Sequence, residues 1–187
     1  MPHNVALPTI YYAIFGIFEP ILTVVGFFGT VANPKVVRCL KPENEISSDL
    51  LGQAHDNQAP WPNDIPPTEP LPQATLVSIV QLAHVCGLLG VLNFFILRAV
   101  RKHLRDQPAV QEKIVAALLM PLAFADVFHL VITLWALGDS RWDCRRWSGL
   151  LWSTVLFGLS LLIPRIAWNL GIGRYVHTRD GRPGKRV

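Results

Sequence analysis

Charged residues are scarce in this sequence, and their absence is concentrated in particular places. Only 16% of the 187 residues are charged, while 51% are hydrophobic and the mean hydropathy is +0.34. Four segments with a combined length of 101 residues hold three of the thirty Lys, Arg, Asp and Glu side chains. A soluble domain spreads its charge over its whole surface, so this distribution excludes an ordinary soluble domain, a disordered chain and a secreted miniprotein.

The motifs of the common cofactor-dependent and hydrolytic enzymes are also missing. The sequence has no Gly-rich phosphate-binding loop, no Ser/His/Asp pattern, no C-x-x-C pair and no H-E-x-x-H. Hydrolases, kinases, nicotinamide-dependent enzymes and thiol oxidoreductases therefore have no support. The basic residues behind the net charge of +4 flank apolar segments, which is typical of membrane orientation, and we predict neither a cofactor nor a nucleic-acid partner.

The four apolar segments are each long enough to cross a bilayer as a helix. About 20 residues suffice for that, and none of the segments shows the polar alternation of a membrane β-barrel strand. They cover 7–32, 74–97, 114–137 and 147–173. We predict an all-α fold, an integral membrane four-helix transmembrane bundle, as a single domain over residues 1–173 with a basic tail at 174–187.

The connecting segments predict an orientation. The N-terminal side, the 98–113 loop and the tail carry ten Lys and Arg residues, and the opposite side carries six. Both termini are therefore predicted to be cytosolic, with the endoplasmic reticulum as the expected membrane. The long 33–73 loop is acidic and Pro-rich, and it is predicted to be either a lumenal linker or lid or a connector without a function of its own.

Two cysteines are predicted on the lumenal side, where disulfides persist. Cys39 follows the first span and Cys144 precedes the fourth. Spacing alone does not establish the Cα separation of about 5.5 Å that a disulfide needs, so a bridge and two free thiols both stay open.

Ionisable residues inside the spans are the most informative positions, because each costs on the order of 3 kcal/mol to insert and normally faces the bundle interior. Counted from the span ends, Glu19 and Asp126 lie near mid-depth, with His84 and His129 in the same layer. Helical phase places Glu19 on one polar stripe of the first span, and Asp126 with His129 on one stripe of the third. We therefore expect these four side chains to line one internal cavity.

Two other polar residues of the spans are harder to assign. Asn93 lies about 180° from His84 around the second helix, so it is expected to make a different contact. Arg165 lies toward the cytosolic end of the fourth span, and it is either a snorkelling anchor at the interface or a part of the polar site.

Proline interrupts three of the four predicted helices at Pro20, Pro121 and Pro164. Each proline frees a backbone carbonyl, and each lies beside or within about a turn and a half of an intramembrane ionisable group. Kinks beside polar groups favour a cavity, although proline is also common in membrane helices.

Short motifs carry a family resemblance. Pro8-Thr9-Ile10-Tyr11 and Phe18-Glu19-Pro20 in the first span, with Asp126-Val127-Phe128-His129 in the third, resemble a family of small fungal integral membrane proteins, some of which are associated with terpenoid pathways. The layout is also similar to the EXPERA superfamily, which includes emopamil-binding sterol isomerase and the sigma-2 receptor. This resemblance implies a helical bundle in which Glu19, His84 and Asp126 surround a sterol-like ligand.

The residues themselves suggest related chemistry. Burial disfavours the anion of a carboxylic acid, so Asp126 or Glu19 could deliver a proton to an alkene or epoxide at neutral pH. We expect Asp126 to be the main donor and Glu19 the second, because His129 lies one turn from Asp126 and could orient or reprotonate it. His84 or the other carboxylate would accept the departing proton. The side chains predicted to bind the substrate, including aromatic faces for a carbocation, are Tyr12, Thr23, Gln81, Trp135, Trp152, Arg165, Trp168 and Asn169.

The predicted function is a membrane-embedded, cofactor-independent isomerase or cyclase that acts on a lipophilic terpenoid or sterol-like substrate. Three alternatives stay open: a noncatalytic lipid- or metabolite-binding accessory protein, a bundle whose polar residues only link helices, and a Zn or Fe site built from the two acids and two histidines. The last has only a D-x-x-H spacing in its favour, so no metal is predicted. The expected partners are a lipophilic small molecule and the bilayer, and a homo-oligomer or pathway enzymes stay open.

Overall fold

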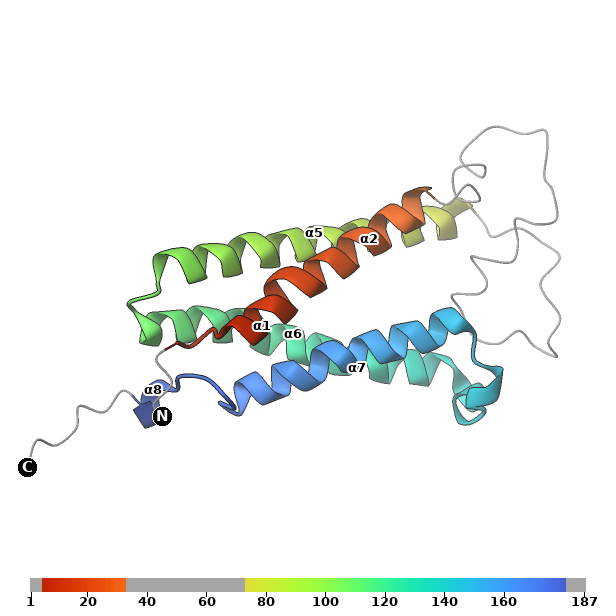
Figure 1. Cartoon of the computed structure of the whole chain (residues 1–187). Coiled ribbons are helices and arrows are strands. Elements are labelled where there is room, and N and C mark those ends of the chain that lie inside the picture. Colours follow the sequence, from red (N-terminus) through yellow and green to blue (C-terminus); the bar gives the residue numbers. More distant parts are fainter. Residues whose placement is uncertain (1–4, 33–72, 181–187) are drawn as a thin grey trace, which may run out of the picture.

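The computed structural model describes residues 5–32 and 73–180, and this part of the chain is helical with no strand (Figure 1). Its elements are α1 (Thr9–Ala13), the π-helix η1 (Ile14–Phe18), α2 (Glu19–Ala32), α5 (Gln73–His103), α6 (Pro108–Ala136), the 3₁₀ turns η4 (Gly138–Trp142) and η5 (Cys144–Arg146), α7 (Gly149–Asn169) and α8 (His177–Asp180). Four helical stretches are long and apolar enough to cross a membrane: Thr9–Val31, Val77–His103, Pro108–Ala136 and Leu151–Asn169. The prediction of an all-α four-span protein is confirmed. The predicted 33–73 loop lies almost wholly outside the described residues, as do Cys39 and the last part of the tail.

Local signals set several helix ends. Pro108 occupies the first turn of α6, where its missing N–H costs no hydrogen bond. The Ser148 hydroxyl accepts a hydrogen bond from the Leu151 N–H at 3.1 Å and caps α7. Gly171, with a φ of 76°, follows the end of α7 in the left-handed region that favours glycine. Two predicted spans were too short. The helix α5 continues beyond residue 97 to His103, and α6 begins before residue 114, at Pro108.

The first span changes its helical winding just before Glu19. Pro20 has no N–H to donate, and the Glu19 N–H bonds the Ile14 carbonyl, five residues back, at the end of η1. Such a wide turn inserts an extra residue, so the phase of a regular helix does not continue from Tyr12 to Glu19. The predicted stripe therefore does not continue from Tyr12 to Glu19, although Glu19 and Thr23 both face α5. Pro121 and Pro164 lie inside α6 and α7, which both continue through them as helices.

The helices pack chiefly as two pairs, α2 with α5 and α6 with α7 (Figure 1). Glycine allows the close approach in the first pair. A Cβ added at Gly90 would lie 1.9 Å from Thr23 Oγ1 and 3.2 Å from the Cα of Pro20, and one at Gly87 would lie 3.1 Å from the Phe27 Cβ. Small residues commonly permit such backbone contact between membrane helices.

The two pairs meet at one end of the bundle, which we call the terminal end because Val5, the turn between α5 and α6, and Tyr175 lie there. The opposite end, with Ala32, Gln73 and the 137–148 turn, is the loop end. Contacts of α5 with α6, and of η1 with α7, join the pairs. The ribbons move apart toward the loop end in Figure 1.

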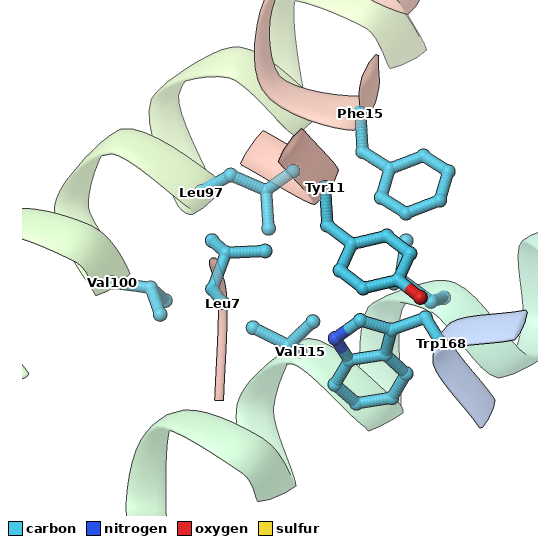
Figure 2. Close-up of a cluster of buried hydrophobic side chains, with 8 residues drawn as sticks. Leu7, Tyr11, Phe15, Leu97, Val100, Val115 and Trp168 are labelled. Carbon is cyan, nitrogen blue, oxygen red and sulfur yellow. The ribbon is translucent and has the colours of Figure 1, made fainter. Parts of the chain in front are cut away.

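An apolar core fills the terminal end (Figure 2). Its buried members come from the N-terminal segment and all four spans: Leu7, Tyr11, Phe15, Leu97, Val100, Val115, Leu119 and Trp168. The Tyr11 and Phe15 rings stack with centroids 6.1 Å apart, and the Tyr11 hydroxyl donates to the Ile172 carbonyl at 2.7 Å. This core holds the first helix against the other three on the terminal side of Glu19.

Polar side chains tie both terminal segments to the same core. Gln111 Oε1 accepts the N–H groups of Ala6 and Leu7, both at 3.0 Å. The Trp168 indole donates to the Ala6 carbonyl at 3.0 Å, and the Tyr175 N–H donates to the Val5 carbonyl at 3.0 Å. The start of the first helix therefore has a defined position relative to α6 and α7.

Candidate functional site

Four polar residues, one from each span, form a single network inside the bundle: Glu19 of α2, Asn93 of α5, Asp126 of α6 and Arg165 of α7. Glu19 Oε1 accepts hydrogen bonds from Asn93 Nδ2 at 3.0 Å and from Arg165 Nη2 at 2.5 Å. Arg165 Nη1 donates to Asp126 Oδ2 in a second ion pair. We call these four residues the polar network. It joins the α2–α5 pair to the α6–α7 pair through one guanidinium.

The network is deeply buried within the described part of the chain. Arg165 is 1% exposed, Asn93 3% and Glu19 5%, while the Asp126 side chain is 18% exposed. Arg165 also lies 5.7 Å from the centre of the Phe15 ring, next to the apolar core. Of the two positions considered for Arg165, the structure has it inside the site and not as a snorkelling anchor.

Two buried atoms of the network have no hydrogen-bond partner among the described residues: Glu19 Oε2 and Arg165 Nε. Two ionised carboxylates and one guanidinium also leave one negative charge in excess. A buried uncompensated charge is unfavourable, and a single proton on the network would cancel it. Glu19 Oε2 is the fully buried carboxylate oxygen without a partner, since Oε1 accepts both hydrogen bonds, whereas the Asp126 side chain is 18% exposed.

The structure does not bring His84 to the two acids. Its exposed side chain packs on the Phe27 ring, with centroids 5.8 Å apart, and it lies nine residues from Asn93, or about 13 Å along the helix toward the loop end. The expectation that His84 shares their layer is therefore wrong. On a helix, side chains three residues apart differ in direction by about 60°. Asn93 is three such steps from His84, so its side chain points to the opposite side of α5 and faces Glu19.

His129 lies one turn from Asp126 on α6, close enough for an electrostatic interaction with its carboxylate. Its side chain is exposed in the described structure and makes no hydrogen bond to the network. Glu19 and Asp126 are thus the two predicted catalytic residues that the structure joins through a common partner.

The residues predicted to bind the substrate are spread along the bundle. Arg165 belongs to the network. The Thr23 hydroxyl donates to the backbone carbonyls of Glu19 and Pro20, at 3.1 Å each, and packs against Gly90. The Tyr12 ring lies 4.4 Å from the guanidinium of Arg101 at the terminal end.

Two of the three tryptophans among these residues lie toward the loop end, and the third lies one turn from Arg165 on α7. Trp168 is buried in the terminal core. Trp152 packs on Trp147, and its indole donates to the Cys144 carbonyl at 3.3 Å at the loop end. Trp135 is 75% exposed and lies nine residues beyond Asp126. Gln81 and Asn169 are exposed on α5 and α7. Aromatic side chains of the spans therefore do not gather around the acids as predicted.

The role of Arg165 as a shared partner of both acids is the feature that the sequence interpretation missed. A signal for it was present, because the spans hold two acids and one Arg, and unpaired charges are costly there. The position of Asn93 opposite His84 on its helix was a weaker signal that Asn93 makes a contact of its own. Among residues 5–32 and 73–180, no three His, Cys, Asp or Glu side chains lie close enough together to hold a metal ion, so the Zn or Fe alternative has no geometric basis there.

Comparison with known proteins identifies one family whose model matches this chain. A family model described as a domain of unknown function, DUF7704, matches residues 4–175. No curated protein and no solved structure matches the chain. The match includes all four spans and every member of the polar network.

Proposed function

We propose that this chain, which belongs to the DUF7704 family, is a membrane-embedded isomerase or cyclase that acts on a lipophilic terpenoid or sterol-like substrate by proton transfer. The observation that supports this proposal is the free, buried Oε2 of Glu19 inside a network with excess negative charge. Such a network is suited to hold one exchangeable proton in a place without bulk water. Buried intramembrane acids with named partners commonly mark proton-transfer sites.

The geometry favours Glu19 over Asp126 as the proton donor. Arg165 is always protonated and bonds both carboxylates, so one ionised acid balances its charge and the other acid is the one to carry a proton. Glu19 Oε2 is buried without a partner, whereas the Asp126 side chain is 18% exposed, so a negative charge is less costly on Asp126 than on Glu19. The proposal therefore gives Asp126 the role of the fixed counter-charge to Arg165.

The proposed reaction needs no redox partner. Glu19 Oε2–H gives its proton to one carbon of an alkene, and the π electrons form the new C–H bond. The neighbouring cationic carbon is neutralised when an adjacent C–H bond gives its electrons to a new double bond and its proton to the carboxylate. The double bond has moved, the mass is unchanged and Glu19 holds a proton again.

Of the two reactions, isomerisation fits the described residues better than cyclisation. A cyclase must surround its carbocation with several aromatic faces. Phe15 lies beside Arg165, but Trp135 and Trp152 lie toward the loop end. A proton shift between neighbouring carbons needs fewer such faces.

The test is turnover in microsomes that contain the protein, with a panel of prenylated, epoxidised and sterol substrates and mass-spectrometric detection of isomers of unchanged mass. Glu19→Gln keeps the hydrogen bonds of Oε1 but removes the acidic proton, and turnover should fall by about 10² to 10⁴. Asp126→Asn should reduce it less. Glu112→Gln, which removes a carboxylate from the Arg174 ion pair at the terminal end, is the matched control. Full turnover by Glu19→Gln would show that this residue is not the donor.

A purely structural role, in which the polar residues only link the helices, is the second candidate. Direct bonds between members of the network are what helix linking requires, at about 0.6 to 2 kcal/mol per contact. In that case Glu19→Gln lowers the melting temperature of the purified protein, and no substrate of the panel yields an isomer. Retained stability with lost turnover supports catalysis instead.

We also propose that the protein resides in the endoplasmic reticulum with both termini in the cytosol. Its support is the excess of Lys and Arg on the terminal side, ten against six. Protease treatment of sealed microsomes should remove the C-terminal tail and spare the 33–73 loop. Digestion of the loop with a protected tail means the inverse topology.

A further inference from the structure

Three basic residues form a stripe where α5 leaves the apolar span at the terminal end. Arg98, Arg101 and Lys102 are spaced i, i+3 and i+4, which places them on one face of the helix. The span itself continues to His103, so the stripe lies within its last two turns. If α5 crosses a bilayer, basic residues at the end of the apolar span are expected at the boundary between the hydrocarbon and the headgroups.

These three residues differ in their partners from the arginines that the fold uses in ion pairs. Arg165, Arg174 and Arg179 each form an ion pair with a carboxylate. Within the described ranges, no carboxylate forms an ion pair with any residue of the stripe. Arg98 and Arg101 lie over aromatic rings instead, those of Phe94 and Tyr12, at 5.9 and 4.4 Å.

Arg101 is held in place with most of its donors unused. Its side chain is half-buried, and Nη2 donates one hydrogen bond to the Thr9 hydroxyl at 3.1 Å. A guanidinium has five N–H donors in a fixed plane, so this contact and the Tyr12 ring fix its orientation and leave donors for an anion. Arg98 and Lys102 are exposed beside it.

We propose that Arg98, Arg101 and Lys102 bind the phosphate of an anionic phospholipid headgroup. Arg binds phosphate through paired N–H groups, and Lys adds a mobile positive charge. A lipid is favoured over a soluble phosphate because the stripe begins inside the apolar span, where the acyl chains of that lipid pack along α5. Basic residues next to a membrane helix are attracted to anionic lipid of the cytosolic leaflet.

Native mass spectrometry of the full-length protein in detergent tests the proposal by titration with phosphatidylserine and, separately, with phosphatidylcholine. The wild type should bind phosphatidylserine more tightly. The triple variant R98Q/R101Q/K102Q should lose affinity for it by about fivefold per charge removed, with no change for phosphatidylcholine. K102Q alone changes an exposed position and should lose about fivefold in affinity for phosphatidylserine. This single variant tests the proposal if the triple variant does not fold. R145Q removes an exposed charge at the loop end and is the matched control.

Three results would overturn the proposal. The first is equal affinity of the wild type for the two lipids. The second is unchanged phosphatidylserine affinity in K102Q and the triple variant, or an equal loss of affinity in R145Q. Either outcome would show that the stripe is not the binding site. The third is competition by glycerol 3-phosphate at concentrations close to those of the lipid, since the phosphate alone would then be the ligand.

Discussion

The two ends of this bundle hold their helices together in different ways. On the terminal side of the polar network, the N-terminal segment and all four spans share one apolar core, and polar contacts fasten both terminal segments to it. Large apolar side chains are exposed on both sides, such as Ile10 and Trp135, but the members of the shared buried core all lie on the terminal side. The network lies at the boundary between the two regions.

This difference explains why the polar network forms at this depth of the bundle. The terminal core brings α2, α5, α6 and α7 to close range, and the first layer beyond the core is the one in which Arg165 reaches Glu19 and Asp126. A charged group there is surrounded by protein on the terminal side. The loss of Arg165 should therefore separate the two helix pairs first on the loop side.

The largest expected effect comes from Arg165→Met. The substitution leaves two buried carboxylates without their shared guanidinium, and removal of one partner of a buried ion pair commonly costs about 3 to 5 kcal/mol of stability. Unfolding in mixed micelles measures the loss. The triple variant E19Q/D126N/R165M removes all three charges and should recover most of it. An unchanged unfolding free energy in Arg165→Met would show that the ion pairs do not join the two helix pairs.

A smaller effect is expected from the terminal core. Leu97→Ala removes a side chain that is 0% exposed, and the lost packing should cost about 2 kcal/mol, the low end of the usual range because lipid supplies little hydrophobic driving force. Leu92→Ala, on the same helix but 47% exposed, should change the unfolding free energy by less than about 0.5 kcal/mol. Equal losses in the two variants would mean that the terminal core is not the main packing unit.

The smallest expected effect concerns the α2–α5 contact, which continues toward the loop end. Gly90→Ala places a methyl group against Thr23 Oγ1 and the backbone of Pro20, and overpacking should cost about 1 kcal/mol, the low end of the usual range, because the Thr23 side chain can rotate away. Gly26→Ala meets no atom within 4 Å and should be neutral. Thermal unfolding of both variants in one detergent compares them. A neutral Gly90→Ala would mean that the pair packs less closely than described.

Much of the fold was predictable from local sequence features. The near-absence of charge over four long segments identified the spans, because only helices and closed barrels satisfy the backbone in hydrocarbon. Pro108 and Ser148 act within one turn of their own positions, so the ends that they define depend on no distant contact. The importance of Glu19 and Asp126 was predictable for the same reason, since the cost of a charge in the membrane belongs to the residue itself.

The partners of those residues were decided only by the tertiary structure. Glu19 and Asn93 are 74 residues apart, and Glu19 and Arg165 are 146 apart, so their contacts depend on how the helices rotate against one another. The π-turn before Pro20 shifts the phase on which the predicted stripe relied. Sequence by itself determined which side chains are too costly to leave unpaired in a membrane. Packing of the helices decided that Arg165 and Asn93, and not His84, contact Glu19, because a hydrogen bond requires a register and a rotation that no single helix contains.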